Sequence, residues 1–259
     1  MKWLRFVHNN ASAFGRIEGE TDAYKVRVFT GNMFAAPVST ETLLDLQDLE
    51  ILPPCAPSKM LALWNNFAAA AAKNGWPTPV EPLYFVKPSN TFSAHKKMVE
   101  KPKSYGGRVL YEAELGIVIG KAGKNISIED AASHVFGYTC VNDVTALEIL
   151  RADTSFEQWT RAKGFDGFAP FGPYIETEVD VASLHVKAIV NGRERQNYPV
   201  SDMFFSPLQL VSLLSRDVTL WPGDVISCGT SLGAGPWQAD AEVQISIDGV
   251  GTLTNTLTI

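Results

Sequence analysis

The sequence predicts an α+β protein that is rich in β-strands, with a small N-terminal β domain over residues 1–57 and a main domain over residues 58–259. Segments with strand-like composition outnumber those with helical patterns. The proline-rich stretch PPCAPSK interrupts regular structure near residue 57, which suggests a domain boundary there. The 259 residues, of which 46% are hydrophobic, can bury a sizeable core.

The first half of the chain predicts strands and one alanine-rich helix. Strands are expected in the segments WLRFVHN, AFGRIEG and AYKVRVF, and again in KMLALW. The alanine run that follows favours a helix, which Gly75 and Pro77 should end. The aromatic segment PLYFVKPSNTF predicts a strand that ends at Pro88.

The second half of the chain predicts mostly strands, with two helices. In SIEDAASHVFG, Ser127 is a candidate N-cap with Asp130 three residues later, and Gly137 should end the helix. A second helix is expected in SPLQLVSLLSRD. Strands are expected in the segments YTCVND, GPYIET, HVKAIVNG, DVISCGTS and EVQISIDGVGTLTNTLTI. The last of these contains a hairpin signal at Asp248-Gly249.

Charge and composition exclude several classes of partner. A net charge of -6 argues against a nucleic-acid binder, for which a basic surface is expected. No stretch is apolar for long enough to suggest a membrane span, and the first residues, MKWLRFVHNN, become polar too soon for a signal peptide. We therefore expect a cytoplasmic protein whose partners are small molecules. The three cysteines, which have no paired spacing, are expected to be buried and free.

Two glutamates interrupt the apolar segment YEAELGIVIG. Glu112 and Glu114 are two residues apart, so a strand would direct both carboxylates to one face. Burying two like charges is costly unless a cation lies between them. Asp143 ends another apolar strand, and three carboxylates without His or Cys suit Mg²⁺, Mn²⁺ or Ca²⁺ rather than zinc. The alternative is that the two glutamates lie on the solvated face of a half-exposed strand.

Two later segments suggest an anion site. In WTRAKGFDGFAPFGP, Lys163 and Asp166 are expected in a turn among aromatic residues, where the lysine would meet an anion. In LWPGDVISCGTSLGAG, a strand ends at Gly229 and Thr230, in a glycine-spaced loop whose backbone can closely approach a bound anion.

In sequence and order, these segments resemble those of the fumarylacetoacetate hydrolase family. The blocks are YEAELGIVIGK, GYTCVNDVTA, RAKGFDGFAPFGP, NGRERQNYPVSDMFFSP and PGDVISCGTSLGAG. The resemblance covers residues 58–259, and residues 1–57 look like the small N-terminal domain of many members. It implies a mixed β-roll in the main domain, a homodimer, and Mg²⁺ or Mn²⁺ at the active site.

The resemblance also implies roles for individual residues. Glu112, Glu114 and Asp143 match the metal ligands, and Lys163 matches a lysine near the substrate carboxylate. Thr230, after Gly229, matches the threonine of the carboxylate-binding loop, and Asp166 is expected near the substrate. The substrates so implied are 2-oxo acids, acylpyruvates and related dicarboxylates. Reactions of the family share an enolate and differ in whether an acyl group, carbon dioxide or only a proton leaves.

The chain departs from the hydrolases of the family in the segment WNNFAAAAAKNGW. Ala70 stands where a water-activating histidine is expected, and Lys73 where its partner glutamate is expected. His95, in TFSAHKK, is the candidate substitute acid or base. The alanine run has three explanations: a reaction without hydrolysis, an engineered replacement of a histidine, for example at position 68, or a mobile lid whose alignment is shifted.

These observations leave three functions open. Hydrolysis of a C–C bond in an acylpyruvate-type dicarboxylate is the family default. Isomerisation, keto-enol tautomerisation or decarboxylation of the same substrate class is the alternative, because the histidine-glutamate pair is missing. A catalytically silent protein that binds a 2-oxo acid is the third.

Overall fold

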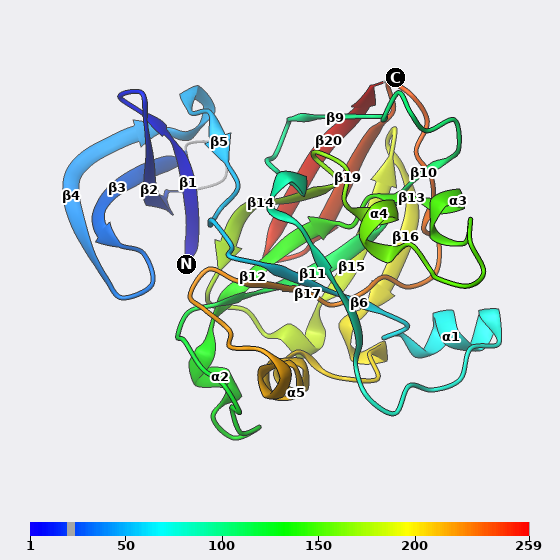
Figure 1. Cartoon of the computed structure of the whole chain (residues 1–259). Helices are drawn as coiled ribbons and strands as arrows, with labels where there is room; N and C mark the ends of the chain where they lie inside the picture. The colour runs from blue at the N-terminus through cyan, green and yellow to red at the C-terminus, as the bar shows by residue number, and fades with distance from the viewer. Residues whose placement is uncertain (20–23, 259) are drawn as a thin grey trace.

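A computed structural model describes residues 1–19 and 24–258, and it shows a β-rich α+β fold (Figure 1). The N-terminal part consists of β1 (Lys2–His8), β2 (Ala11–Glu18), β3 (Lys25–Asn32), β4 (Ala36–Asp45) and β5 (Ile51–Leu52). The first three are the strands that the sequence predicts. Ala23 and Ile259, at the ends of two predicted strands, lie outside the described residues.

The main part of the chain contains the other strands and all the α-helices of the described residues. Its strands are β6 (Met60–Trp64), β7 (Leu83–Lys87), β8 (Phe92–Ser93), β9 (Met98–Glu100), β10 (Val109–Tyr111), β11 (Ala113–Ile119), β12 (Val135–Asn142), β13 (Thr145–Ala146), β14 (Ala169–Glu176), β15 (His185–Val190), β16 (Arg193–Pro199), β17 (Val225–Ser227), β18 (Gly235–Pro236), β19 (Glu242–Ile247) and β20 (Gly251–Thr258). Its helices are α1 (Ala68–Asn74), α2 (Ala131–His134), α3 (Leu147–Leu150), α4 (Trp159–Lys163) and α5 (Pro207–Asp217). No helix in the described ranges is long and apolar enough to cross a membrane.

One long sheet runs through both parts of the chain. Its strand order is β4-β3-β2-β1-β14-β12-β11-β17-β6-β7, and β1 joins the N-terminal strands to β14 of the main part. A second sheet has the order β16-β15-β19-β20-β9. Leu115 and Ile117 of β11 share a core with Val186 of β15 and Ile245 of β19, so side chains from both sheets fill the centre of the β-roll.

Strand β11 is the central element for the site. All seven of its residues are buried, and it pairs with β12 on one side and β17 on the other. A strand that is covered in this way requires an apolar sequence, which AELGIVI provides except at Glu114. The carboxylate of Glu114 is therefore placed inside the protein by the strand that contains it.

Local signals correctly predict several element ends. Gly75 ends α1 in the left-handed conformation at φ 68°, as expected. The helix expected in SPLQLVSLLSRD is α5, and the structure shows that Ser206 and Gln209 form a capping box at its start. Strands β19 and β20 form the expected hairpin around Asp248-Gly249.

Two local predictions are wrong. The helix predicted over SIEDAASHVFG is only the four residues of α2, and Gly137 lies inside β12 rather than at a helix end. Ser127 and Asp130 do hydrogen-bond each other, but Val135 is already paired with Ile119 of β11, so strand pairing replaces the predicted helix. Lys163 is the last residue of α4 rather than part of a turn.

Candidate active site

Three carboxylates meet at the start of β11 and the end of β12. Glu112 lies between β10 and β11, Glu114 lies in β11, and Asp143 directly follows β12. Ala113 is opposite Asn142 in the antiparallel pair, which brings these positions together. One carboxylate oxygen from each of the three residues lies within 4.8 Å of the others.

Hydrogen bonds hold the two glutamates in place. Glu114 Oε2 accepts a hydrogen bond of 2.6 Å from Ser227 Oγ and one of 2.9 Å from the backbone N–H of Gly229. Glu112 Oε1 accepts one of 2.8 Å from Thr145 Oγ1. The second oxygen of Glu114, Oε1, is buried and has no hydrogen-bond partner among the described residues. A buried carboxylate oxygen without a partner is costly, so this atom points to a missing positive group.

Two lysines also contact the carboxylates. Lys163 Nζ lies 2.8 Å from Glu112 Oε2 and 2.5 Å from Asp143 Oδ2. Lys87, whose side chain is fully buried, places its Nζ 2.5 Å from Asp143 Oδ1. The cluster of three carboxylates and two ammonium groups therefore has a formal charge of about -1 when all are ionised.

The pKa values separate the members of the cluster. Burial would raise the pKa of Asp143, but Lys163 and Lys87 outweigh it, so the net direction is downward. Burial, together with the nearby Asp143 charge, raises the pKa of Glu114 well above its usual range. Burial would lower the pKa of Lys163, but the surrounding carboxylates raise it, led by Asp143. The pKa of Lys87 is lowered, first by burial. Glu114 is therefore the group whose charge the protein alone does not compensate.

The three carboxylates fit a hard divalent cation. Their ligand atoms are all oxygens, they are close enough to share one ion, and Glu114 Oε1 has no other partner. Lys163 already bridges Glu112 and Asp143, but each carboxylate oxygen has two lone-pair sites and can accept from a lysine and bind a metal together. The donor set suits Mg²⁺ or Mn²⁺ and lacks the nitrogen or sulfur ligands typical of zinc.

A cavity of about 670 Å³ opens beside the cluster. Glu112, Lys163 and Thr230 line it, as does Ser231. The Thr230 hydroxyl is engaged, because it donates to the Ala113 carbonyl at 2.9 Å and accepts from Gln196 Nε2 at 2.9 Å. The Ser231 hydroxyl is buried and has no partner within residues 1–19 and 24–258, so it is free to donate to a molecule in the cavity.

Gly229 makes a contact other than the one expected, and Asp166 lies outside the cavity lining. Gly229 adopts φ 89°, where a Cβ would lie 3.2 Å from the Leu63 carbonyl, and its N–H binds Glu114 rather than pointing into the cavity. Asp166 is exposed, is absent from the cavity lining, and accepts a hydrogen bond of 2.6 Å from Asn90. The geometry thus makes Gly229 a support for the Glu114 carboxylate and places Asp166 outside the cavity lining.

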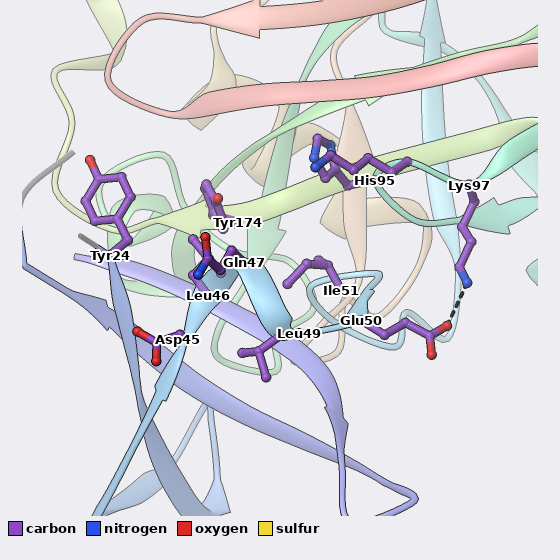
Figure 2. Close-up of a pocket in the computed structure, with 11 residues that line it drawn as sticks. Tyr24, Asp45, Leu46, Gln47, Leu49, Glu50, Ile51, His95, Lys97 and Tyr174 are labelled. Carbon is purple, nitrogen blue, oxygen red and sulfur yellow. Dashed lines mark hydrogen bonds and ion pairs between the residues drawn. The ribbon is translucent and has the colours of Figure 1, made fainter. Parts of the chain in front are cut away.

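His95 lies in a different cavity, of about 600 Å³, between the N-terminal strands and the main part (Figure 2). Its Nδ1 accepts a hydrogen bond of 3.1 Å from the backbone N–H of Thr254. Burial, together with Lys96, lowers the pKa of His95 to about 4. Figure 2 shows Lys97 and Glu50 paired beside the same cavity. The distance from Lys97 Nζ to Glu50 Oε1 is 2.6 Å. The candidate role of His95 as acid or base therefore has no support from the geometry.

The alanine helix borders the acidic cavity. Ala70 and Lys73 of α1 both line it, and Lys73 is exposed. Ala68, the position considered for a replaced histidine, is not among the lining residues. A methyl group therefore faces the cavity at the position where a family hydrolase is expected to have its histidine.

Sequence reasoning missed three residues of the site. Lys87 binds Asp143, Ser231 offers a free hydroxyl, and Gln196 holds the Thr230 loop by donating to Thr230 Oγ1 and to the Ser231 carbonyl. A lysine at the end of an otherwise apolar and aromatic strand was an available signal for Lys87. Gln196 lies within one of the matched blocks but has no distinctive local pattern.

Comparisons with known proteins identify a family and similar structures. Residues 59–258 match the family profile described as fumarylacetoacetate (FAA) hydrolase, C-terminal, and residues 1–54 match the profile described as Rv2993c-like, N-terminal. The structure resembles that of 5-carboxymethyl-2-hydroxymuconate delta-isomerase from Mycobacterium smegmatis with a TM-score of 0.92 and 35% identity, covering 100% of this chain and 99% of the other.

Some curated relatives have names that state an activity. Oxaloacetate tautomerase YisK of Bacillus subtilis is 35% identical over 212 residues, which are 77% of this chain and 69% of that protein. The 4-hydroxyphenylacetate degradation bifunctional isomerase/decarboxylase of Salmonella dublin is 37% identical over 206 residues, which are 78% of this chain and 47% of that protein.

Proposed function

The chain belongs to the fumarylacetoacetate hydrolase family, and from this premise we propose that it is a metal-dependent tautomerase or isomerase of a 2-oxo acid. The main support is the cavity beside the three carboxylates. It presents the Ala70 methyl group to the substrate, and within the described residues no histidine lines it. Proton transfer next to a carbonyl requires an enolate but no activated water, so this cavity suits it better than hydrolysis.

Glu112, Glu114 and Asp143 would hold Mg²⁺ or Mn²⁺. Such an ion supplies positive charge that stabilises the oxygen of an enolate. The protein's part is to fix the three carboxylates through β11, β12 and the bonds from Ser227 and Gly229. It also shields two of the three carboxylates from bulk water, because Glu114 and Asp143 are both fully buried.

We assign Lys163 to stabilising the developing enolate oxygen, as a hydrogen-bond donor. Its Nζ belongs to the carboxylate cluster while its side chain also lines the cavity, so it can meet both the substrate and the ligands of the ion. Because its pKa is raised, it is an ammonium group that donates to a developing oxyanion. Ser231, with its free hydroxyl, is placed to donate to the substrate carboxylate.

Decarboxylation of the same substrate class is the second candidate. It passes through the same enolate and likewise needs no water-activating base. The relative from Salmonella dublin is named an isomerase/decarboxylase, and the one from Bacillus subtilis an oxaloacetate tautomerase, so both candidates have a named counterpart.

The test uses chelator-treated protein to which Mg²⁺ or Mn²⁺ is restored, with oxaloacetate, acetylpyruvate and fumarylpyruvate as substrates. We expect faster relaxation of the enol absorbance band with a constant total of 2-oxo acid. Release of carbon dioxide would assign the second candidate, and two product acids would assign hydrolysis. If none of these substrates is converted, the protein would be a catalytically silent binder and the proposal would be refuted.

A further inference from the structure

We propose that the acidic cavity contains a subsite for a flat apolar substituent, so that the preferred substrate is a 2-oxo acid with a planar apolar tail rather than a short dicarboxylate. The subsite is the aromatic wall formed by Trp64, Trp76, Phe85 and Trp159. The inference rests on the proposed function for the position of the 2-oxo acid head. It goes beyond that function by stating the chemistry of the tail.

The wall is assembled from four separate segments. Trp64 ends β6, Trp76 follows α1, Phe85 lies in β7 and Trp159 begins α4. The ring centroids of Trp64 lie 5.0 Å from Trp76 and 5.8 Å from Trp159, and Phe85 stacks on Trp159 at 5.2 Å. All four rings line the cavity, and all four are half-buried rather than enclosed in the core. The four rings are therefore partly accessible from the cavity.

The wall begins at the acidic cluster. Lys163 Nζ lies 5.2 Å from the centroid of the Phe85 ring, and the same ammonium group contacts Glu112 and Asp143. A 2-oxo acid whose head meets this lysine would extend its tail along Phe85 towards Trp159 and Trp64. Aromatic faces bind flat groups by stacking, and they gain most from rings or conjugated chains.

The size of the cavity supports a substantial tail. Its volume of about 670 Å³ falls within the range of sites that enclose ligands of drug size. A short dicarboxylate would fill only the head region and leave the aromatic faces in contact with water. Displacing that water with a flat apolar group is favourable in proportion to the apolar area that it covers.

The charged side chains around the cavity contribute little to binding a second carboxylate on the substrate. Arg151 and Lys73 line it, but both are exposed, and exposed ion pairs contribute little. Glu148 lines the same cavity and adds a negative charge. The Arg108 guanidinium that compensates Glu148 at 2.7 Å is already engaged in that pair. The aromatic wall is thus the stronger feature for recognising the tail.

The experiment compares three ligands that share the oxamate head in titrations of Mn²⁺-loaded protein followed by calorimetry. Oxamate has no tail, N-oxalylglycine has a carboxylate tail, and N-phenyloxamate has a flat aryl tail. We expect N-phenyloxamate to bind at least about tenfold more tightly than oxamate, and N-oxalylglycine to gain less than about threefold.

Substitutions in the aromatic wall test whether it accounts for the tighter binding of N-phenyloxamate. Trp76→Leu and Trp64→Leu should each remove most of the advantage of N-phenyloxamate while oxamate affinity, which reports an intact head site and fold, stays the same. Trp221→Leu is the matched control, because Trp221 is 52% exposed and lies outside the cavity lining. It should leave all three affinities unchanged.

Three results would overturn the inference while leaving the proposed function in place: equal binding of oxamate and N-phenyloxamate, tightest binding of N-oxalylglycine, or an aryl advantage that survives in both Trp64→Leu and Trp76→Leu. Failure of all three ligands to bind to the metal-loaded protein would instead show that the shared head site does not exist. That result would refute both the proposed function and the inference.

Discussion

Replacing Glu114 by Gln should abolish stabilisation by a divalent metal while leaving the metal-free fold intact. Glu114 is fully buried, its Oε1 has no partner, and its pKa is raised by burial, so the metal-free protein gains little from its charge. A glutamine keeps the shape and can still accept a hydrogen bond from Ser227 or Gly229. In chelator, the free energy of unfolding should therefore change by less than about 1 kcal/mol.

Binding of the metal should stabilise the native protein substantially against thermal unfolding. At a metal concentration of about 100 times Kd, a single site that is absent from the unfolded chain stabilises the fold by about 2.7 kcal/mol. For a chain of this size, that corresponds to a rise in Tm of roughly 5–10 °C. Thermal denaturation with Mn²⁺ and with chelator should show this rise for the native protein and essentially none for Glu114→Gln.

Glu176→Gln is the matched control. Glu176 is also buried, but it lies in β14 and pairs with the N-terminal amine rather than with the cluster. It should reduce stability equally with and without Mn²⁺ and leave the metal-induced rise in Tm unchanged. A Glu114→Gln protein with the same Mn²⁺-induced rise as the native protein would refute the ligand assignment.

Three further predictions concern other residues of the two cavities. Lys163→Met should lower kcat for enol relaxation by at least about 10²-fold. Calorimetry should show undiminished Mn²⁺ affinity, because the ammonium group that competes for the carboxylates is removed. Loss of both kcat and Mn²⁺ affinity would instead indicate a structural role for this lysine. Lys73→Gln should change kcat by less than about twofold, because Lys73 is exposed, and a tenfold loss would instead identify it as a base. His95→Asn, which retains an acceptor for the Thr254 N–H, should remove part of the acid sensitivity of the fold. Since the folded-state pKa of His95 is about 4 and its ordinary value is 6.5, the native protein should lose stability as the pH falls from 6.5 towards 4. Urea titrations at pH 7 and pH 4.5 should show a loss smaller by roughly 1–2 kcal/mol in His95→Asn, after allowing for solvent screening, and an equal loss in both proteins would contradict this.

The acidic cluster was predictable because it depends on local patterns. Glu112 and Glu114 stand out in an apolar strand, Asp143 ends another, and strands adjacent in sequence commonly pair. The positions of Thr230 and of Gly229 were also predictable, since glycine-spaced loops after a strand bring the backbone close to neighbouring groups. What each of them contacts was not, because the N–H of Gly229 meets Glu114 only through the pairing of β11 with β17.

Residues whose roles depend on distant partners were missed or misplaced. In β7, Leu83 and Val86 are exposed while Lys87 is fully buried, the reverse of what hydrophobicity suggests, because Asp143 attracts the lysine inward. His95 is near the alanine helix in sequence, but it hydrogen-bonds to β20 and faces the N-terminal strands. The lysine in β7 is visible in the sequence, but neither its partner Asp143 nor the partner of His95 can be read from neighbouring residues.

The most direct test of the account is to locate the ion. Crystals of the chelator-treated protein soaked in Mn²⁺ and oxalate should give one strong anomalous peak per chain, bound by oxygens of Glu112, Glu114 and Asp143 at about 2.0–2.3 Å, with oxalate completing the shell towards Ser231. A Mn²⁺ peak elsewhere, or no peak with Lys163 still bridging Glu112 and Asp143, would contradict it.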